Sequence, residues 1–560
     1  MKKLGSFFKK HSESIKTIEH KFLKQGINDV GEHFVKVSAN GGIDYVINKV
    51  CDHAGGRLIL KENVAVCPLH DWRLNLESLQ YNNSHECKKT VDFNLDEDGN
   101  IQVAEQKSHL VNPFKGEKKG EVKLRWLNHA TVYIECNGKS IITDPWLFGP
   151  AFLTGWWLAS PSPEDSIELL RNADYVFISH NHPDHLHAET LSILPKNKKL
   201  IVADFGSKSA EKYLQALGFT NIQALSFNDI FAIGDHFQIS ILKSGDFRDD
   251  SGLYVYANGH EYLLTVDCNF LNFNILPREV DMLFTSFAGG ASGFPLCFHN
   301  YTEEEKGAIL KRNKGAVKFL VTQYLQAAQP RYYSPYAGMF SEYAERDSYI
   351  KETNQKNAAT DYAELAQKHK AQFIAPAADQ EIIFTNGTLI LNKLEVDFLQ
   401  PEETEFYIDK LKEEYQYDAD AIIAYFKESN YSGKQIIEII PTDDNFEQIV
   451  GGIVYADFYK KEFRVITEKE LVTEEPGYRV MQLKVRPEAF MCVVENYLPW
   501  EDFSIGFQMR VTRMPNEYES DFWYHFTNNY IGKRHFRYSS FCGACTVIEQ
   551  NPIWVKTETA

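Results

Sequence analysis

Two short pairs of metal-binding residues most constrain the fold of this chain. Within residues 50–74, VCDHAGGRLILKENVAVCPLHDWRL, Cys51-x-His53 is followed by Cys67-x-x-His70, with thirteen residues between the pairs. Each pair offers one thiolate and one imidazole. A single site can use all four side chains only if the fold presents two loops side by side. The flanking residues alternate between apolar and polar, which predicts a small β domain that carries these loops.

The mixed pairs favour an iron-sulfur cluster over a zinc site. A two-iron cluster with two cysteines on one iron and two histidines on the other takes one cysteine and one histidine from each loop. A Cys2His2 zinc finger normally has both cysteines in one loop and both histidines in the other. We therefore predict a Rieske [2Fe-2S] cluster bound by Cys51, His53, Cys67 and His70.

A second metal motif, ISHNHPDHLH at residues 178–187, follows the apolar run DYVFIS. Its H-x-H-x-D-H spacing is the pattern of the metallo-β-lactamase superfamily. We expect His180 and His182 at one metal position, and Asp184 and His185 at the next, where both are predicted to be catalytic as well. Asp144 ends an earlier strand and can orient a ligand, while Asp267 stands where a bridging carboxylate is expected. His187 falls outside the pattern, and we interpret it as a loop residue.

The motif departs from a complete two-zinc site. Residues 242–255, LKSGDFRDDSGLYV, contain no histidine, so Asp246 is the first candidate substitute, with Asp249 and Asp250 as competitors. After Asp267 only His299 is available. Two histidines and one carboxylate form the ligand set of mononuclear non-haem iron oxygenases. The motif's first two histidines, His180 and His182, with Asp246 or Asp267, could supply that set, and zinc is the alternative metal.

The pattern of strand-like and helix-like runs divides the chain into three parts. We predict an all-β Rieske domain over residues 1–115, a linker FKGEKKG at 114–120, an αββα metallo-β-lactamase-like domain over 121–395, and an α+β C-terminal domain over 396–560. The first sixteen residues are expected to be a solvated helix or a frayed terminus. The apolar run VKFLVTQYL is counted among the strands of the second part.

Composition excludes several classes of function. The 560 residues carry a formal net charge of −18, which argues against binding of nucleic acid. No apolar run approaches the length of a membrane span. Nine cysteines are scattered without a secretory signal, so a cytoplasmic location with reduced thiols is expected. The C-x-x-C pair Cys542 and Cys545 has no second pair and is not assigned to a site.

Several long stretches resemble the CMP-N-acetylneuraminate hydroxylase family. They include DPWLFGPAFLTGWWL, ISHNHPDHL, TVDCN, FAGGASGFP, YIKETN and IGFQMR, and the resemblance runs from about residue 25 to 530. It implies a Rieske-coupled monooxygenase that uses O2 to convert an N-acetyl group to N-glycolyl, or a related N-acyl or amine substrate. It also implies electrons from cytochrome b5 or a ferredoxin with its NAD(P)H reductase. The family has a histidine where this chain has Asp246.

The resembling stretches also contain residues that are not metal ligands. Arg331, Lys351 and Arg510 lie in or beside these stretches and are candidates to bind an anionic substrate such as a nucleotide sugar. Trp156 and Trp157 favour core packing over stacking on a ligand. Two other functions stay open: a metal-dependent hydrolase with a regulatory Rieske domain, and a non-catalytic redox relay. The metal content distinguishes the three.

Overall fold

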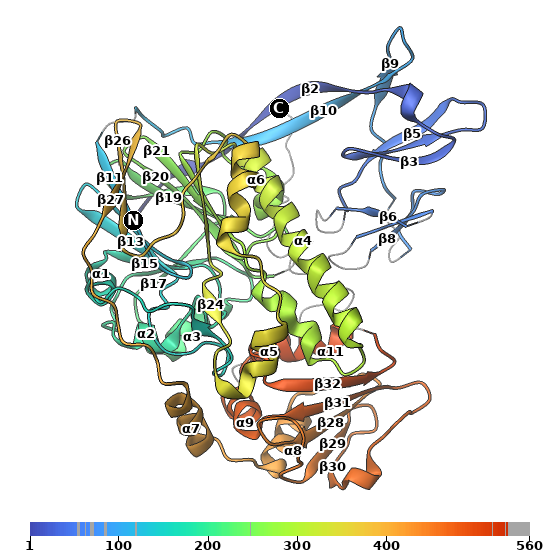
Figure 1. The fold of residues 1–560 in the computed structure, drawn as a ribbon, viewed down its shortest axis with the longest axis vertical. Helices are drawn as coiled ribbons and strands as arrows, with labels where there is room; N and C mark the ends of the chain where they lie inside the picture. The colour runs from blue at the N-terminus through green and yellow to red at the C-terminus, as the bar shows by residue number, and fades with distance from the viewer. Residues whose placement is uncertain are drawn as a thin grey trace.

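The computed structural model describes residues 1–52, 57–61, 63–67, 72–82, 87–117, 120–246, 248–517, 519–531 and 534–535. His53 and His70 lie outside these ranges, as do Cys542 and Cys545. Three small three-stranded sheets lie at one end of the molecule, and two eight-stranded sheets with helices form its middle. A five-stranded sheet with helices forms the other end (Figure 1). Within the described ranges, no helix is both long enough and apolar enough to cross a bilayer.

Two eight-stranded sheets form the middle of the molecule. The first has the order β17 (Ile222–Leu225), β16 (Leu200–Ala203), β15 (Tyr175–Ile178), β13 (Lys139–Thr143), β12 (Thr131–Cys136), β11 (Glu121–Asn128), β26 (Gln380–Thr385), β27 (Thr388–Lys393). The second has the order β1 (Lys2–Ser6), β18 (Asp229–Gly234), β19 (Phe237–Lys243), β20 (Ser251–Ala257), β21 (His260–Leu264), β22 (Met282–Ser286), β23 (Tyr332–Tyr336), β25 (Gln372–Phe373). Both sheets mix parallel and antiparallel pairs.

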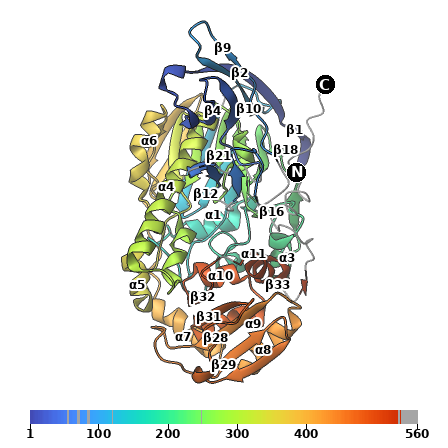
Figure 2. The ribbon, with the colours of Figure 1, turned by 90° about the vertical axis from the view of Figure 1, so that its right-hand side faces the viewer.

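Apolar side chains of the two sheets share one core, and helices cover the outer faces. Ile134 of β12 and Ile239 of β19 belong to the same fully buried cluster. On one outer face lie α1 (Ser166–Asn172), α2 (Ala188–Ser192) and α3 (Ser209–Ala216), whose leucines pack against β15 and β16. On the other lie α4 (Glu303–Ala328) and α6 (Ala363–Lys368) (Figures 1 and 2). The predicted αββα layering is confirmed.

The run VKFLVTQYL is helical, so its prediction as a strand was wrong. It lies inside α4, which begins at a capping box formed by Thr302 and Glu305. The buried side chains of its second half are Val321, Tyr324, Leu325 and Ala328. Their spacing of three and four places them on one helix face, whereas a strand would bury alternate residues. The apolar run was too short for composition alone to distinguish the two.

The start of the chain is a strand and not a helix or a frayed end. β1 pairs antiparallel with β18, so the first residues complete the edge of the second central sheet. Lys3 Nζ and Ser6 Oγ both reach the carboxylate of Asp229 at 2.5 Å. β2 (Phe8–Ile18) then pairs with β10 (Ile101–Val111) over eleven residues, and the two form the long ribbon that leads to the N-terminal sheets (Figure 1).

The N-terminal part consists of short strands. One sheet contains β3 (Gly26–Val30), β4 (His33–Val37) and β5 (Ile43–Asn48), another contains β6 (Ile59–Lys61), β7 (Val64–Val66) and β8 (Arg73–Asn75), and β9 (Phe93–Leu95) pairs with β10. β4 and β5 form a hairpin whose turn contains the sequence ANGG. Cys51 follows β5 and Cys67 follows β7, which places both in one apolar cluster.

The C-terminal part combines a five-stranded sheet with helices. The order is β30 (Glu462–Ile466), β29 (Ile453–Asp457), β28 (Gln435–Pro441), β31 (Arg479–Val485), β32 (Met509–Met514). α7 (Thr404–Glu414), α8 (Ala419–Glu428), α9 (Pro487–Asn496) and α10 (Trp500–Ile505) accompany it. Buried side chains of this part and of α4 join a single cluster, so the C-terminal part packs directly against the middle of the molecule.

Candidate metal centre

The H-x-H-x-D-H residues lie at one edge of the central sheets. β13 and β15 run parallel, so Asp144 after β13 and His180 after β15 emerge at the same edge. Asp267 follows β21 of the facing sheet, and His129 occupies the turn between β11 and β12. Strand ends from two sheets therefore bring these side chains together, as α/β enzymes commonly do.

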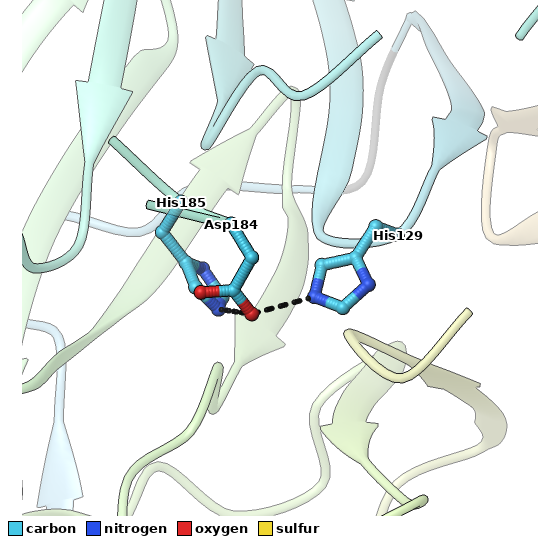
Figure 3. Close-up of side chains that lie close together, drawn as sticks. All are labelled: His129, Asp184 and His185. Atoms are coloured by element: carbon cyan, nitrogen blue, oxygen red, sulfur yellow. Dashed lines mark ion pairs between the residues drawn. The ribbon is translucent and has the colours of Figure 1, made fainter. Parts of the chain in front are cut away.

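Four donor atoms form a chain of short contacts at this edge. His129 Nε2 lies 3.2 Å from Asp184 Oδ2, and that oxygen lies 3.4 Å from His185 Nε2. His185 Nε2 lies 3.4 Å from Asp267 Oδ2. Figure 3 shows His129 and His185 on either side of the Asp184 carboxylate. The first three side chains are almost fully buried.

These donors fit a metal ion. Both ring nitrogens of His129, Nε2 of His185, and Oδ1 of both Asp184 and Asp267 are buried without a hydrogen bond. Such atoms are costly to bury unless another partner satisfies them. Around a tetrahedral ion with bonds of about 2.1 Å, neighbouring donors stand about 3.4 Å apart. The observed spacing, with imidazoles and carboxylates as the donors, suits zinc or non-haem iron.

Asp144 supports the centre from behind His185. Its Oδ2 lies 3.3 Å from His185 Nδ1, while Oδ1 accepts a hydrogen bond of 2.7 Å from the backbone N–H of Ser179. Burial raises the pKa of Asp144, although its contacts with His185 and Ser179 act to lower that pKa. A carboxylate beside Nδ1 can orient the imidazole of His185 so that Nε2 faces the other donors.

His180 and His182 contact each other on another side of the centre, and we call this pair the second arm. His180 Nε2 lies 2.9 Å from His182 Nδ1, and His180, His185 and Asp267 together could hold an ion. The ring of His185 belongs to both potential metal groups. We expected His180 and His182 at one metal position, and Asp184 and His185 at the next. The structure instead gives two groups that share His185, and His182 belongs to neither.

Glu501 contacts this arm from the C-terminal part of the chain. Its Oε2 lies 3.5 Å from His182 Nε2. Burial would lower the pKa of His182, but the Glu501 carboxylate raises it to about 9. The same contact lowers the pKa of Glu501 against the opposing effect of burial. α10, which carries Glu501, is thereby joined to the H-x-H-x-D-H loop.

Asp246 lies outside both potential metal groups. Its Oδ2 accepts hydrogen bonds from Arg248 Nε at 2.9 Å and Asn269 Nδ2 at 2.8 Å, and Ser244 donates to Oδ1. Arg248 also forms a 3.0 Å ion pair with Asp250, and its Nη2 donates to the Asp267 carbonyl. Asp246 thus anchors an arginine that stands beside the centre, and the structure does not bring it to the metal-facing donors.

The remaining candidates lie elsewhere. Asp249 accepts a hydrogen bond from Ser207, and exposed His299 donates its backbone N–H to Val511, outside both potential metal groups. His187 begins α2, where Nδ1 accepts from the backbone N–H of Thr190. Arg331 pairs with Asp281, and Lys351 is exposed.

Trp156 and Trp157 are core residues. Trp156 stacks on Phe340 with ring centroids 3.6 Å apart, and its indole N–H donates to the Ile505 carbonyl. Trp157 is fully buried. Trp156 therefore fastens the loop after β13 to the end of α10, which supports the placement of Glu501 beside the centre.

The cysteine pair of the N-terminal part occupies a shared apolar setting. Cys51 and Cys67 are each 1% exposed and lie in one cluster with Leu58 and Tyr81. Arg57, the bridge partner of Val50, places its guanidinium carbon 5.0 Å from the centroid of the Phe319 ring on α4. The predicted histidine ligands lie outside the described residues, so the four-ligand set stays a prediction.

Three residues of the site were missed by sequence reasoning: His129, Arg248 and Glu501. His129 had a local signal, because it is a polar residue in the turn between the strand-like runs VKLRWL and TVYIEC. Arg248 and Glu501 had no local signal in the sequence that distinguishes them from ordinary charged residues on the surface. Glu501 is more than 300 residues from the motif that it contacts.

A cavity of about 270 Å³ adjoins the centre at the boundary with the C-terminal part. Its lining includes Pro183 of the motif, Phe152, Tyr213, Lys410 and Asp502. Burial raises the pKa of Asp502 to about 8, so this carboxyl faces the cavity without a fixed negative charge at neutral pH. The H-x-H-x-D-H loop therefore borders a cavity that is lined by both apolar and polar side chains.

Comparisons with known proteins cover about nine-tenths of the chain. Residues 123–243 match the family described as "Beta-lactamase superfamily domain". The chain is 32% identical to the cytidine monophosphate-N-acetylneuraminic acid hydroxylase of Danio rerio over 90% of its own length and 91% of that protein. It is 30% identical to the hydroxylase of the same name from Mus musculus, over 90% and 93%. Among solved structures, CmlA, a diiron beta-hydroxylase from Streptomyces venezuelae, covers 48% of this chain and 54% of that one at 16% identity, with a TM-score of 0.33.

Proposed function

Because the chain belongs to the cytidine monophosphate-N-acetylneuraminic acid hydroxylase family, we propose that it is a monooxygenase that hydroxylates the N-acetyl group of a nucleotide sugar. The observation that carries this proposal is the match over nine-tenths of both chains. The two overlapping potential metal groups, which share His185, support it, since hydroxylation of a methyl group by O2 needs a redox metal. The overall reaction is R–CO–CH3 + O2 + 2 e⁻ + 2 H⁺ → R–CO–CH2OH + H2O.

The second part of the proposal assigns the metal ligands. His129, Asp184 and His185 would hold a non-haem iron. His180 and Asp267, which form the overlapping group with His185, would complete its surroundings or hold a second ion, and His182 contacts His180. Iron bound there would supply the O2 chemistry. Asp144, 3.3 Å from His185 Nδ1, would orient that imidazole, and the burial of His129, Asp184 and His185 limits access of water. Asp246 instead fixes Arg248, whose charge offsets the surrounding carboxylates.

Hydroxylation also needs a supply of electrons. We propose that Cys51, His53, Cys67 and His70 bind a Rieske [2Fe-2S] cluster, which passes electrons singly. A cytoplasmic donor such as cytochrome b5 or a ferredoxin, with its NAD(P)H reductase, would reduce it. The stacking of Arg57 on Phe319 supports a route within one chain, because it holds the cluster-bearing part against α4. On the same helix, the hydroxyl of Tyr324 donates to the carbonyl of Cys268, next to Asp267.

One experiment separates this proposal from a metal-dependent hydrolase. The purified protein, loaded anaerobically with Fe²⁺, is given CMP-N-acetylneuraminate, a reductase system and 18O2. The proposal expects one 18O atom in an N-glycolyl product, and no product without O2 or electrons. Hydrolysis of the nucleotide sugar under anaerobic conditions, with label entering only from water, would instead establish the hydrolase.

A further inference from the structure

Three segments that supply none of the metal-facing donors meet at one place. They are the 3-10 helix η3 (Gly290–Cys297), α5 (Ser348–Thr353) with the residue after it, and the start of β32. A Cβ atom added to Gly293 of η3 would lie only 2.6 Å from Asn354 Oδ1, so η3 and the end of α5 are in close contact. The guanidinium of Arg510 on β32 lies 5.7 Å from the ring of Tyr349 on α5. Phe298, just after η3, forms a bridge with Val511.

Two cations stand opposite each other at this meeting point. Arg510 on β32 is the direct antiparallel partner of Lys484 on β31, so both side chains leave the same face of the sheet. Like charges in such a pair destabilise a sheet unless a negative group joins them. In the part of the chain that the structure describes, neither cation has a carboxylate within ion-pair distance. Arg510 is nevertheless only 8% exposed.

The bonds that these two cations do make leave donors available. Arg510 Nη1 donates to the carbonyls of Phe507 and Met509, and the guanidinium carbon lies 4.1 Å from the centroid of the Phe446 ring. Lys484 Nζ donates to the Phe446 carbonyl at 2.9 Å. These contacts orient the two groups but do not neutralise them. An ammonium keeps two further hydrogens, and a guanidinium has five N–H donors in all.

Nearby carboxylates are already used by other cations. Glu303 pairs with Lys306 at 2.9 Å, and Asp347 pairs with Arg486 at 2.6 Å. Partial desolvation lowers the pKa of His299, although its side chain is exposed, and the charges of Lys484, Arg510 and Lys306 lower it further. A positive region without counter-charge, in a chain of net charge −18, is an attractive site for an anion.

We propose that Arg510 and Lys484 bind the phosphoryl group of a nucleotide. A rigid, stacked guanidinium suits two oxygens of a phosphoryl group, and a lysine adds a point charge. Because Arg510 is only 8% exposed, a small anion suits the site better than a protein surface. This site deepens the proposed function, because the expected substrate is a phosphodiester. α10, which supplies Glu501 beside His182, contacts η3 and so connects the two sites.

Calorimetric titration with cytidine 5′-monophosphate, without O2 or reductant, tests the site. Arg510→Gln keeps the size and polarity of the side chain and should weaken binding about 10- to 100-fold, as expected for loss of a charge-assisted pair. Lys484→Gln should weaken it less, by about 5- to 10-fold, because a lysine is a single point contact. Inorganic phosphate should compete with the nucleotide.

Arg464→Gln is the matched control. Arg464 lies in the same sheet and over an aromatic ring, Tyr455, but it has its own partner, Glu470, at 2.9 Å. Its replacement changes the net charge equally and should leave binding unchanged. Absence of saturable binding by the wild type, or equal affinity of wild type and Arg510→Gln, overturns the site. If Arg510→Gln fails to fold by circular dichroism, Lys484→Gln decides by the same criterion. Because no turnover is measured, failure of the hydroxylase proposal leaves this test intact.

Discussion

Replacement of Gly155 by alanine should destabilise the junction that holds α10 beside the metal centre. Gly155 lies in the loop after β13 and packs against Gly506, at the end of α10. A Cβ atom at Gly155 would lie 2.2 Å from the Gly506 carbonyl oxygen and 2.6 Å from its Cα. Ordinary contacts between carbon atoms are about 3.5–4.0 Å long. The two segments must therefore separate by about 1 Å, and no side-chain rotation can relieve a contact between backbone atoms.

The expected cost follows from this geometry. Overpacking by one methyl group typically costs about 1–3 kcal/mol, and a backbone contact places Gly155→Ala near the upper end of that range. A loss of about 3 kcal/mol corresponds to a melting midpoint lower by about 6–12 °C for a cooperative unit of 150–250 residues. In the wild type, Glu501 Oε2 lies 3.5 Å from His182 Nε2, and separation of the segments would move the two apart. The variant should therefore lose bound metal to a chelator faster than the wild type.

Gly315→Ala is the control for the same chemical change. Gly315 lies within α4, and a Cβ atom added there would meet nothing within 4 Å. Alanine should stabilise this helix by about 0.5–1 kcal/mol, because glycine loses more backbone freedom on folding. Differential scanning fluorimetry and calorimetry of the three proteins provide the measurement. A midpoint of Gly155→Ala equal to that of the wild type would refute the reasoning, as would equal shifts in both variants.

Three further outcomes test the site and its surroundings. His129→Ala should lower bound iron per chain, measured by plasma mass spectrometry, whereas His369→Ala, remote from the centre, should not; equal iron in both would remove His129 from the ligands. Cys67→Ser should abolish a [2Fe-2S] spectrum but keep the iron of the second site, so an unchanged spectrum would exclude Cys67. Asp444 binds Arg346 and Lys412 at 2.9 and 2.6 Å, and although burial opposes it, these contacts lower its pKa. Its contribution to stability is therefore present above the unfolded pKa of about 3.9 and is lost as the pH falls through the folded value. Asp444→Asn should be less stable than the wild type at pH 7, with the difference shrinking in acid; a difference that is constant with pH would contradict this.

The sequence was most informative where a site is local. The motif at residues 178–187 places four potential ligands within six residues, immediately after a buried strand, so spacing alone indicates a metal site. Asp144 and Asp267 could be added because each ends a strand-like run, and strand ends of α/β proteins gather at one edge. The alternation of strand and helix patterns predicted the αββα layers for the same reason, since each layer buries one face of a regular element.

Tertiary structure decided everything that depends on contacts between distant segments. The strand-like run VKFLVTQYL is part of the helix α4. Its buried residues are spaced by three and four, and this becomes visible only once the helix is seen packed against the sheet. Likewise β1 completes an edge of a sheet whose next strand begins at residue 229.

The same limit applies to individual charges. Asp246 and Arg510 are candidates from the sequence and Arg248 and Glu501 are not, but the sequence determines the role of none of the four. Asp246 was expected at the metal, yet a buried arginine two residues away uses its carboxylate. Arg510 faces Lys484 only because of the register of two strands. Whether a buried charge binds a metal, pairs with another side chain or awaits a ligand depends on which opposite charge lies within a few ångströms, and only the packed chain fixes that distance.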